Sequence, residues 1–405
     1  MPANLVKRAI EQSRNREPLV NAMALLGGAR VLAAVDQEAA KQAFAEGVTA
    51  AENLPLAARH LELVLDQAIQ LGTMADPLAA LALFRRLPSG QHRLWPSSTG
   101  SMLLRSLAQS GEVETAIELL EDLNCETGDA DVVVRIASDP ALQRRAMLAA
   151  RERWRALRKR PDFPWPALAQ NGFYRLFSQH WQKLEPSEAE TWLDEILLAI
   201  ETDPDHPTSA RFGEHVELHS IRDMHLFEIL NVLSTLKPPD QVEAILQAHP
   251  DVADAARVYS LGLESSRAQQ RPAPEGGRCG VGFVCSSSGS GGDRLSVAAM
   301  MAAQRGDPSA VQPLLAEARR LHLEDTETND PNLIPRIFWT SYHACKVAMY
   351  WAGKHLGKDA EPLLAEIQDP DFALLASIDL AAGALGLPQH SGVRIEHYPK
   401  GNYRK

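Results

Sequence analysis

The stretch GEHVELHSIRDMH, residues 213–225, combines histidines and acidic residues at spacings that suit metal binding. On a helix, His215, His219 and Asp223 are four residues apart and lie on one face. Two histidines on one face bind a single metal ion, and a carboxylate can assist them. One helix supplies only two adjacent ligands, so a neighbouring helix must complete the site. The pattern predicts either a metal site on this face or an ordinary His219–Asp223 pair.

The same stretch does not reproduce the H-E-x-x-H motif of zinc proteases. In that motif the glutamate directly follows the first histidine, where it serves as the general base. Here Glu214 precedes His215, and Glu217 lies about 200° from it around the helix. The spacing therefore excludes the protease arrangement. The more general alternative, a metal-dependent enzyme that uses the 215–223 face, stays open.

A second stretch, residues 141–183, combines basic and aromatic side chains. It holds ten Lys or Arg residues, seven aromatic residues and only two acids, Glu152 and Asp162. Basic side chains with stacking aromatic rings are typical of single-stranded nucleic-acid sites. Alternatively, the apolar residues are core, and the arginines form a solvated face that pairs with acidic helices elsewhere. The candidate binding residues are Arg151, Arg155, Arg158, Trp154 and Tyr174.

The remaining reactive residues show no cofactor motif. Asp293 and Arg294 follow a Gly/Ser run, where a phosphate-binding loop requires Lys and then Ser or Thr. His343 and Cys345 are two residues apart on a predicted helix and point to different sides, so they do not form a nucleophile–base pair. The four cysteines form no C-x-x-C pair. We therefore predict no cofactor and a reducing compartment.

Composition limits the class of protein. The 405 residues are 45% hydrophobic and 23% charged, which is typical of a globular chain. The net charge of −11 argues against a general nucleic-acid binder, although a local basic surface is compatible with it. The chain has no apolar run of membrane-spanning length and no signal-peptide pattern after Lys7 and Arg8. We therefore predict a cytoplasmic protein without a membrane partner.

The elements that position these residues are predicted to be helices. Apolar residues recur three and four apart along nearly every segment, as in 54–72 and 187–201. An acidic residue followed by proline recurs between segments, and this pair suits the N-cap and first position of a helix. Pairs of this kind include Glu17-Pro18, Asp76-Pro77, Asp139-Pro140, Asp203-Pro204, Asp307-Pro308 and Asp369-Pro370.

Residues 101–123 resemble a tetratricopeptide repeat. Leu107, Gly111, Ala116, Leu120 and Leu123 occupy the positions of its apolar residues, turn glycine and helix-B alanine, whereas Gly100 and Leu104 depart from the pattern. Segments 302–321 and 356–386 resemble HEAT-type repeats, with a Gly-Asp turn, an apolar helix, an Asp-Pro turn and an Ala-rich helix. The resemblance implies an all-α fold, a right-handed superhelix of stacked helical hairpins.

Composition shifts predict the organisation of the chain. Pro, Gly and Ser crowd residues 266–293, which indicates a loop or linker. We predict an N-terminal helical-repeat array over 1–265, a HEAT-like array over 294–388 and an irregular tail over 389–405. The sequence favours a non-enzymatic scaffold that binds a protein or peptide partner on its concave face. A HEAT-like nucleic-acid-binding protein that uses residues 141–183 is the main alternative.

Overall fold

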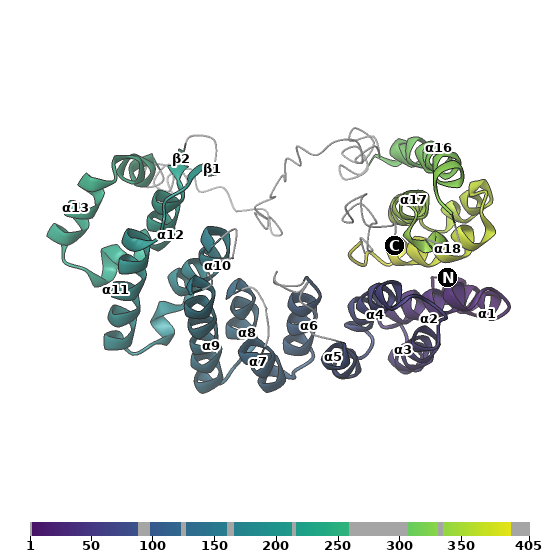
Figure 1. The fold of residues 1–405 in the computed structure, drawn as a ribbon, viewed down its shortest axis with the longest axis horizontal. Coiled ribbons are helices and arrows are strands. Elements are labelled where there is room, and N and C mark those ends of the chain that lie inside the picture. The colour runs from purple at the N-terminus through teal and green to yellow at the C-terminus, as the bar shows by residue number, and fades with distance from the viewer. Residues whose placement is uncertain are drawn as a thin grey trace. The chain divides into compact units, whose positions relative to one another are not determined.

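The computed structural model is α-helical over most of the chain, with one short two-stranded hairpin (Figure 1). It describes residues 2–87, 98–122, 127–159, 166–212, 216–258, 307–330 and 335–389. The predicted all-α class is confirmed. Within these ranges, none of the helices combines the length and the apolar character needed to cross a membrane. The predicted linker 266–293 lies outside the described residues, as does the tail 389–405 beyond its first residue.

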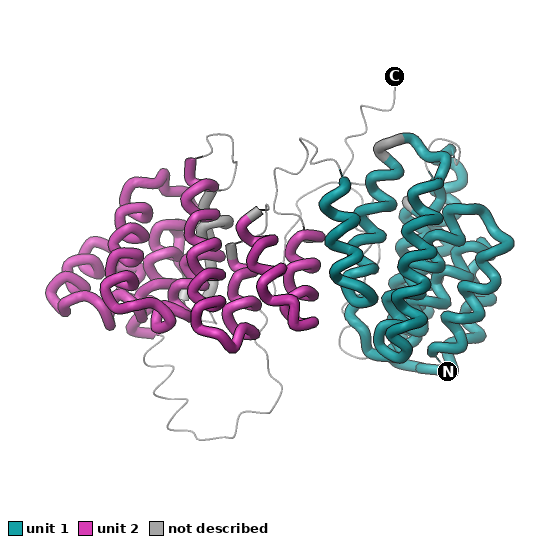
Figure 2. The backbone as a smooth tube through the Cα atoms, turned by 90° about the horizontal axis from the view of Figure 1, so that it is seen from below, with its two compact units in different colours: residues 1–88, 285–405 teal, residues 89–284 magenta. Residues whose placement is uncertain are grey.

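The chain divides into two units (Figure 2). Unit 1 comprises residues 1–88 and 285–405, and unit 2 comprises residues 89–284. This division differs from the predicted arrays over 1–265 and 294–388. The physical reason is that the last described helix packs on the first two helices of the chain. The C-terminal segment therefore completes a core that the N-terminal segment begins.

Unit 1 consists of helical elements from both ends of the chain. They are α1 (Pro2–Ser13), α2 (Pro18–Leu32), α3 (Gln37–Glu52), α4 (Ala58–Gly72), α5 (Pro77–Arg86), η3 (Pro308–Ala310), α16 (Val311–Thr328), η4 (Arg336–Phe338), α17 (Thr340–Leu356), η5 (Gly357–Glu366) and α18 (Pro370–Ala384).

Helix α18 is the centre of unit 1. It packs on α17, α1 and α2, and α2 in turn packs on α3. Phe372, Leu375 and Leu380 are buried on different sides of α18, which is typical of a helix in a protein interior. Its start is fixed by Asp369, whose carboxylate accepts hydrogen bonds from the backbone N–H groups of Asp371 and Phe372 at 2.8 and 3.2 Å.

Unit 2 consists of helices and the hairpin. Its elements are α6 (Ser98–Gln109), α7 (Val113–Asp122), η1 (Thr127–Asp129), α8 (Ala130–Ile136), α9 (Pro140–Arg158), α10 (Pro166–His180), η2 (Trp181–Lys183), α11 (Pro186–Thr202), β1 (Pro207–Phe212), β2 (Val216–Ser220), α12 (Ile221–Leu236) and α13 (Pro239–Ala248).

The first four α-helices of unit 2 form two pairs, and these pairs pack on one another. Helix α6 packs on α7, and α8 packs on α9, while α6 also contacts α8 and α7 contacts α9. Helix α10 contacts α9 and α12, and α11 contacts α12. Gly111 turns the chain between α6 and α7 with a φ of 93°, a conformation that favours glycine. The helix pair predicted over 101–123 is therefore present, with Leu107 and Ala116 fully buried.

The segments that resemble HEAT-type repeats are less regular than predicted. In 356–386 the first predicted helix is the 3-10 helix η5, which contains Pro362, and the second is α18. In 302–321 residues 302–306 lie outside the described residues, and α16 begins at Val311. Pro362 has no backbone N–H group, so it cannot donate a hydrogen bond within η5.

Most acidic–proline pairs begin helices as predicted. The carboxylates that accept a hydrogen bond from a first-turn backbone N–H group are those of Asp76, Asp139, Asp307 and Asp369. Glu17 precedes α2 without a side-chain cap. Asp203 is the exception, because it is the C-cap of α11, and strand β1 rather than a helix follows.

Candidate functional site

The candidate basic residues lie on α9, where two of them share one carboxylate of α11. Arg151 Nε donates to Glu195 Oε2 at 2.9 Å, and the Arg155 guanidinium donates to both Glu195 oxygens. Arg155 also donates to Glu152 on its own helix. Burial alone would raise the pKa of Glu195, but the hydrogen bonds from Arg155 and Arg151 outweigh it and hold that pKa below its usual range. Glu195 is therefore a charged clamp between α9 and α11.

Aromatic rings lie beneath this clamp. The Arg151 guanidinium lies 4.6 Å from the centroid of the Trp192 ring, and the Arg158 guanidinium lies 5.1 Å from that of Trp154. Arg158 also donates to Asp203 at 2.9 Å, beyond the end of α11. Trp154 and Tyr174 are 1% and 0% exposed, and burial raises the pKa of the Tyr174 hydroxyl. Neither ring is presented to solvent for stacking on a nucleic-acid base.

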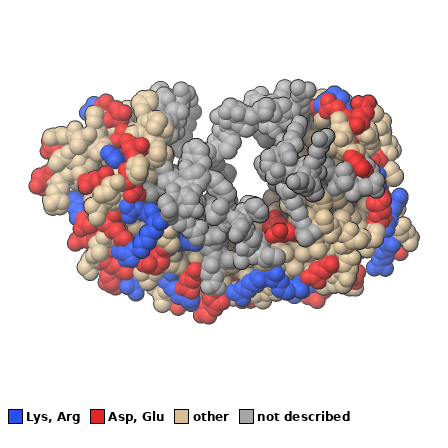
Figure 3. All heavy atoms as spheres, in the orientation of Figure 1, with Lys and Arg blue, Asp and Glu red and all other residues tan. Residues whose placement is uncertain are grey.

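The same pairing continues along α9. Arg144 binds Glu188 at 3.0 Å, and Arg145 binds Glu121 at 2.7 Å. On the face drawn in Figure 3, acidic and basic side chains are intermingled over the described residues. The arginines thus pair with neighbouring acidic helices, as the alternative interpretation of 141–183 expects. Sequence reasoning did not single out the partners Glu195 and Asp203, because they lie about forty residues away along the chain.

Packing of the aromatic rings explains why so many of them occur in this stretch. The Trp154 and Phe173 rings stack with centroids 4.8 Å apart, and Phe173 and Phe177 lie 6.0 and 6.1 Å from Trp192. These residues come from α9, α10 and α11, so their contacts hold the three helices together. Aromatic pairs of this kind contribute about 0.5–1.5 kcal/mol each beyond their buried area. They form a core of unit 2.

The single helix expected over 213–225 is wrong. Val216–Ser220 form strand β2, which pairs with β1 in antiparallel register, Ala210 opposite Leu218. Helix α12 begins only at Ile221, because Ser220 Oγ accepts a hydrogen bond from the Asp223 backbone N–H group and caps it. His219 is exposed on the strand and Asp223 lies in the first turn of the helix. His215 lies outside the described residues.

Asp223 has a partner that the sequence did not indicate. Its carboxylate lies 2.7 Å from Nδ1 of His249, which follows α13, so the expected His219–Asp223 pair is replaced by an Asp223–His249 pair. His225 is buried, with its ring 4.6 Å from that of Tyr174. In the part of the chain that the structure describes, no three His, Cys, Asp or Glu side chains are grouped to hold a metal ion.

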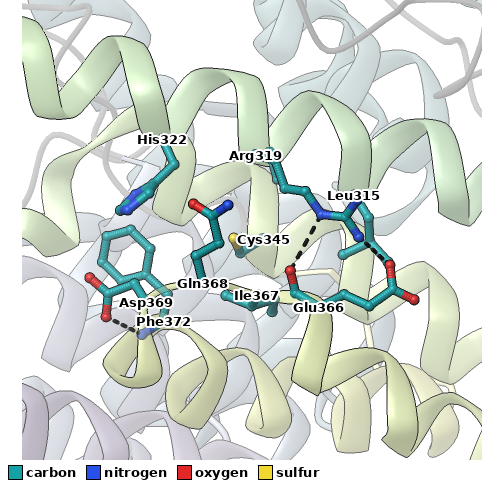
Figure 4. Close-up of a pocket in the computed structure, with 10 residues that line it drawn as sticks. Leu315, Arg319, His322, Cys345, Glu366, Ile367, Gln368, Asp369 and Phe372 are labelled. Atoms are coloured by element: carbon teal, nitrogen blue, oxygen red, sulfur yellow. Dashed lines mark hydrogen bonds and ion pairs between the residues drawn. The ribbon is translucent and has the colours of Figure 1, made fainter.

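A further cluster of reactive side chains lines a small hollow in unit 1 (Figure 4). His322 and Arg319 come from α16 and Cys345 from α17, while Gln368 and the N-cap residue Asp369 directly precede α18. The hollow has a volume of about 10 Å³, which is space for at most one water molecule. Arg319 is paired with Glu366 at its edge. A substrate of ordinary size does not fit this hollow.

The Cys345 thiol is not an activated nucleophile. It is 4% exposed, and burial raises its pKa to about 12. A thiolate is the reactive form of cysteine, so a thiol with this pKa is protonated at neutral pH. Figure 4 shows the His322 ring above Phe372 and the Cys345 sulfur beside Gln368. We therefore interpret the cluster as part of the packed core of unit 1, in which Cys345 is one of the buried side chains.

We expect Cys345 to resist alkylation in the folded protein. Iodoacetamide at pH 8 should leave the peptide that contains Cys345 unmodified, whereas the same treatment in denaturant should modify it fully, because burial and the raised pKa act only in the fold. Peptide-resolved mass spectrometry separates this residue from the other cysteines. Rapid modification of Cys345 in the folded chain would contradict the prediction.

Comparison with known proteins adds no assignment: no protein-family model, curated protein or solved structure matches this chain.

Proposed function

We propose that this chain is a non-enzymatic helical scaffold that binds a protein or peptide partner. The observation that supports the proposal is the packing of the helix pair α6–α7 on the pair α8–α9 in unit 2, with α10 packed on α9 and α12. Such an arrangement buries one side of every pair and leaves extended surfaces along the stack. Stacked helix pairs serve as binding surfaces more readily than as enclosed reaction chambers.

We further propose that the pairs continue as a right-handed α-solenoid of the TPR or HEAT kind, with the partner on the concave side. The turn at Gly111 and the buried Leu107 and Ala116 support this finer assignment. The ion pairs between α9 and α11 support it as well, because they fix the spacing of adjacent pairs on one face.

The chemistry of the described residues also favours binding over catalysis. The Cys345 thiol is buried with a raised pKa, and the His/Asp stretch is divided between a strand and a helix. The α9 arginines are held by acids, so they offer less free positive charge to a nucleic-acid backbone than their number suggests. These observations support the proposal of a protein partner over that of a nucleic-acid partner.

The test is cross-linking of the full chain in extract from its native host, followed by mass spectrometry. We expect one or a few proteins to be enriched over a tag-only control, with cross-links gathered on one face of the helix pairs. Digestion of the extract with nuclease should leave the enrichment unchanged. A chain that is monomeric, captures no protein and binds single-stranded RNA in a salt-dependent manner would overturn the proposal.

A further inference from the structure

Unit 1 carries an open groove between α1 and the junction of η5 with α18. Its volume is about 340 Å³, near the lower end of the roughly 300–1,000 Å³ typical of ligand sites. Leu5 and Ala9 on α1 and Leu374 on α18 form a buried apolar floor. Leu364 and Ala373 also line the groove and are part-exposed. The groove therefore has an apolar surface wide enough for one or two side chains.

Arginines bring positive charge to this groove. Arg8 and Arg16 both line it, and no acidic side chain belongs to its lining. Arg8 forms an ion pair with Glu361, and Arg16 lies 3.5 Å from Asp371. The two arginine side chains are still 53% and 42% exposed. Glu361 is 39% exposed, and an exposed ion pair contributes only about 0–1 kcal/mol, so a ligand carboxylate can replace Glu361 on Arg8 at little cost. Asp371 is only 12% exposed, but it keeps Arg336 as a second partner when Arg16 contacts a ligand.

The spacing of the two arginines sets the spacing of the charges they recognise. Arg8, Gln12 and Arg16 follow one another at intervals of four residues, and all three line the groove. Arg8 and Gln12 lie on α1, which ends at Ser13, and Arg16 lies in the turn that follows it. The two arginines therefore reach the groove from different local structures. Two carboxylates separated by a few residues of one peptide segment would meet both arginines, with apolar side chains between them on the floor.

We propose that this groove binds an acidic peptide segment of a partner protein, with an apolar anchor between carboxylates. The inference rests on the proposed scaffold function, because it names the chemistry of the partner. The net charge of −11 strengthens the argument. An acidic chain repels acidic partners over most of its surface, so a groove whose lining holds two part-exposed arginines, with the acids Glu361 and Asp371 outside that lining, is a local exception that selects where such a segment docks.

The experiment measures fluorescence anisotropy of labelled peptides added to the full chain at low and moderate salt. The first probe contains Glu, Leu and Ala, with the glutamates four residues apart. In the second probe every Glu is replaced by Lys, and in the third every Leu is replaced by Ser. We expect only the first probe to bind, and we expect its affinity to fall as salt rises, because both charge and apolar contact are required.

Variants of the groove provide the control. Arg8→Glu with Arg16→Glu reverses the charges, and Ala365→Trp fills the groove from an exposed position in its wall. Arg14→Glu reverses a single charge nearby, at a residue that is 62% exposed and does not line the groove, and it is compared with Arg8→Glu alone as well as with the double variant. We expect the first two changes to weaken binding of the acidic probe by about tenfold or more, and Arg14→Glu to change it less than about twofold. Circular dichroism confirms that each variant is folded.

The outcomes separate this inference from the scaffold function itself. The proposal that the groove binds an acidic peptide would be overturned if the acidic probe does not bind. It would also be overturned if Arg14→Glu weakens binding as much as the groove variants do. If captured proteins nevertheless persist with Arg8→Glu and Arg16→Glu, the scaffold function stands and its partner binds elsewhere. If the groove variants lose both the probe and the captured proteins, while Arg14→Glu keeps both, the groove is the partner's docking site.

Discussion

Replacement of Gly383 by alanine is expected to lower the free energy of unfolding of unit 1 by at least about 3 kcal/mol, or to prevent its folding. Gly383 lies on α18 where that helix crosses α17. A Cβ atom at this position would lie 2.0 Å from the Tyr350 carbonyl oxygen and 2.9 Å from the Lys354 nitrogen. Both are backbone atoms, so no side-chain rotation relieves the contact and the two helices must separate.

Replacement of Gly353 by alanine, on the other helix of the same crossing, should lower the free energy of unfolding in the same way. A Cβ atom on Gly353 of α17 would lie 2.0 Å from the Leu380 carbonyl oxygen, again a backbone atom. The matched control is Gly27→Ala on α2, where the new Cβ would meet Ile378 at an ordinary 3.6 Å. Alanine at Gly27 should be neutral or should stabilise the fold by up to about 1 kcal/mol, because glycine is the weaker helix former.

Denaturant unfolding with hydrogen exchange tests this pair of expectations. Exchange should accelerate in α17 and α18 for Gly353→Ala and Gly383→Ala, and it should stay unchanged for Gly27→Ala. If Gly383→Ala keeps the stability and exchange protection of the original chain, the close crossing of α17 and α18 is incorrect.

The all-α class was predictable from the sequence because it depends on local patterns. Apolar spacing and acidic–proline caps act within a few residues, and both appear in the structure at Asp76 and Asp139. The turn at Gly111 is equally local. The hairpin β1–β2 was missed because its strands are short and contain few β-branched residues. Ser220 is indistinguishable from an internal helix residue in the sequence, and only the structure shows that it caps α12.

The candidate sites depended on contacts between distant residues, and these were not predictable. Arg151 reads as a free basic group until Glu195, more than forty residues later, is placed beside it. Asp223 reads as a partner of His219 until His249 is placed beside it. The groove in unit 1 joins α1 to α18, from opposite ends of the sequence, so no local pattern marks it. Pairing across the fold decides which charges remain available for binding.

The clamp between α9 and α11 gives the second large effect. Glu195→Ala is expected to lower the free energy of unfolding by about 2–3 kcal/mol, because it leaves Arg151, whose side chain is 12% exposed, without its carboxylate. The matched control is Glu152→Ala. Glu152 belongs to the same network through Arg155, but its side chain is 65% exposed, so its loss should cost less than about 0.5 kcal/mol. Denaturant titrations of the two variants under identical conditions give the comparison, and equal losses would contradict the clamp.

The pH dependence of this contribution has a defined sign. The pKa of Glu195 in the fold lies below its ordinary value of 4.5, because hydrogen bonds from Arg155 and Arg151 outweigh the opposing effect of burial. A depressed carboxyl pKa stabilises the fold at pH values above the ordinary pKa, and this contribution is lost as the pH falls through the lower pKa of the folded state. The stability difference between the original chain and Glu195→Gln should therefore be constant near neutral pH and shrink on acidification below 4.5. A difference that grows as the pH falls would show that Glu195 is not held ionised by the two arginines.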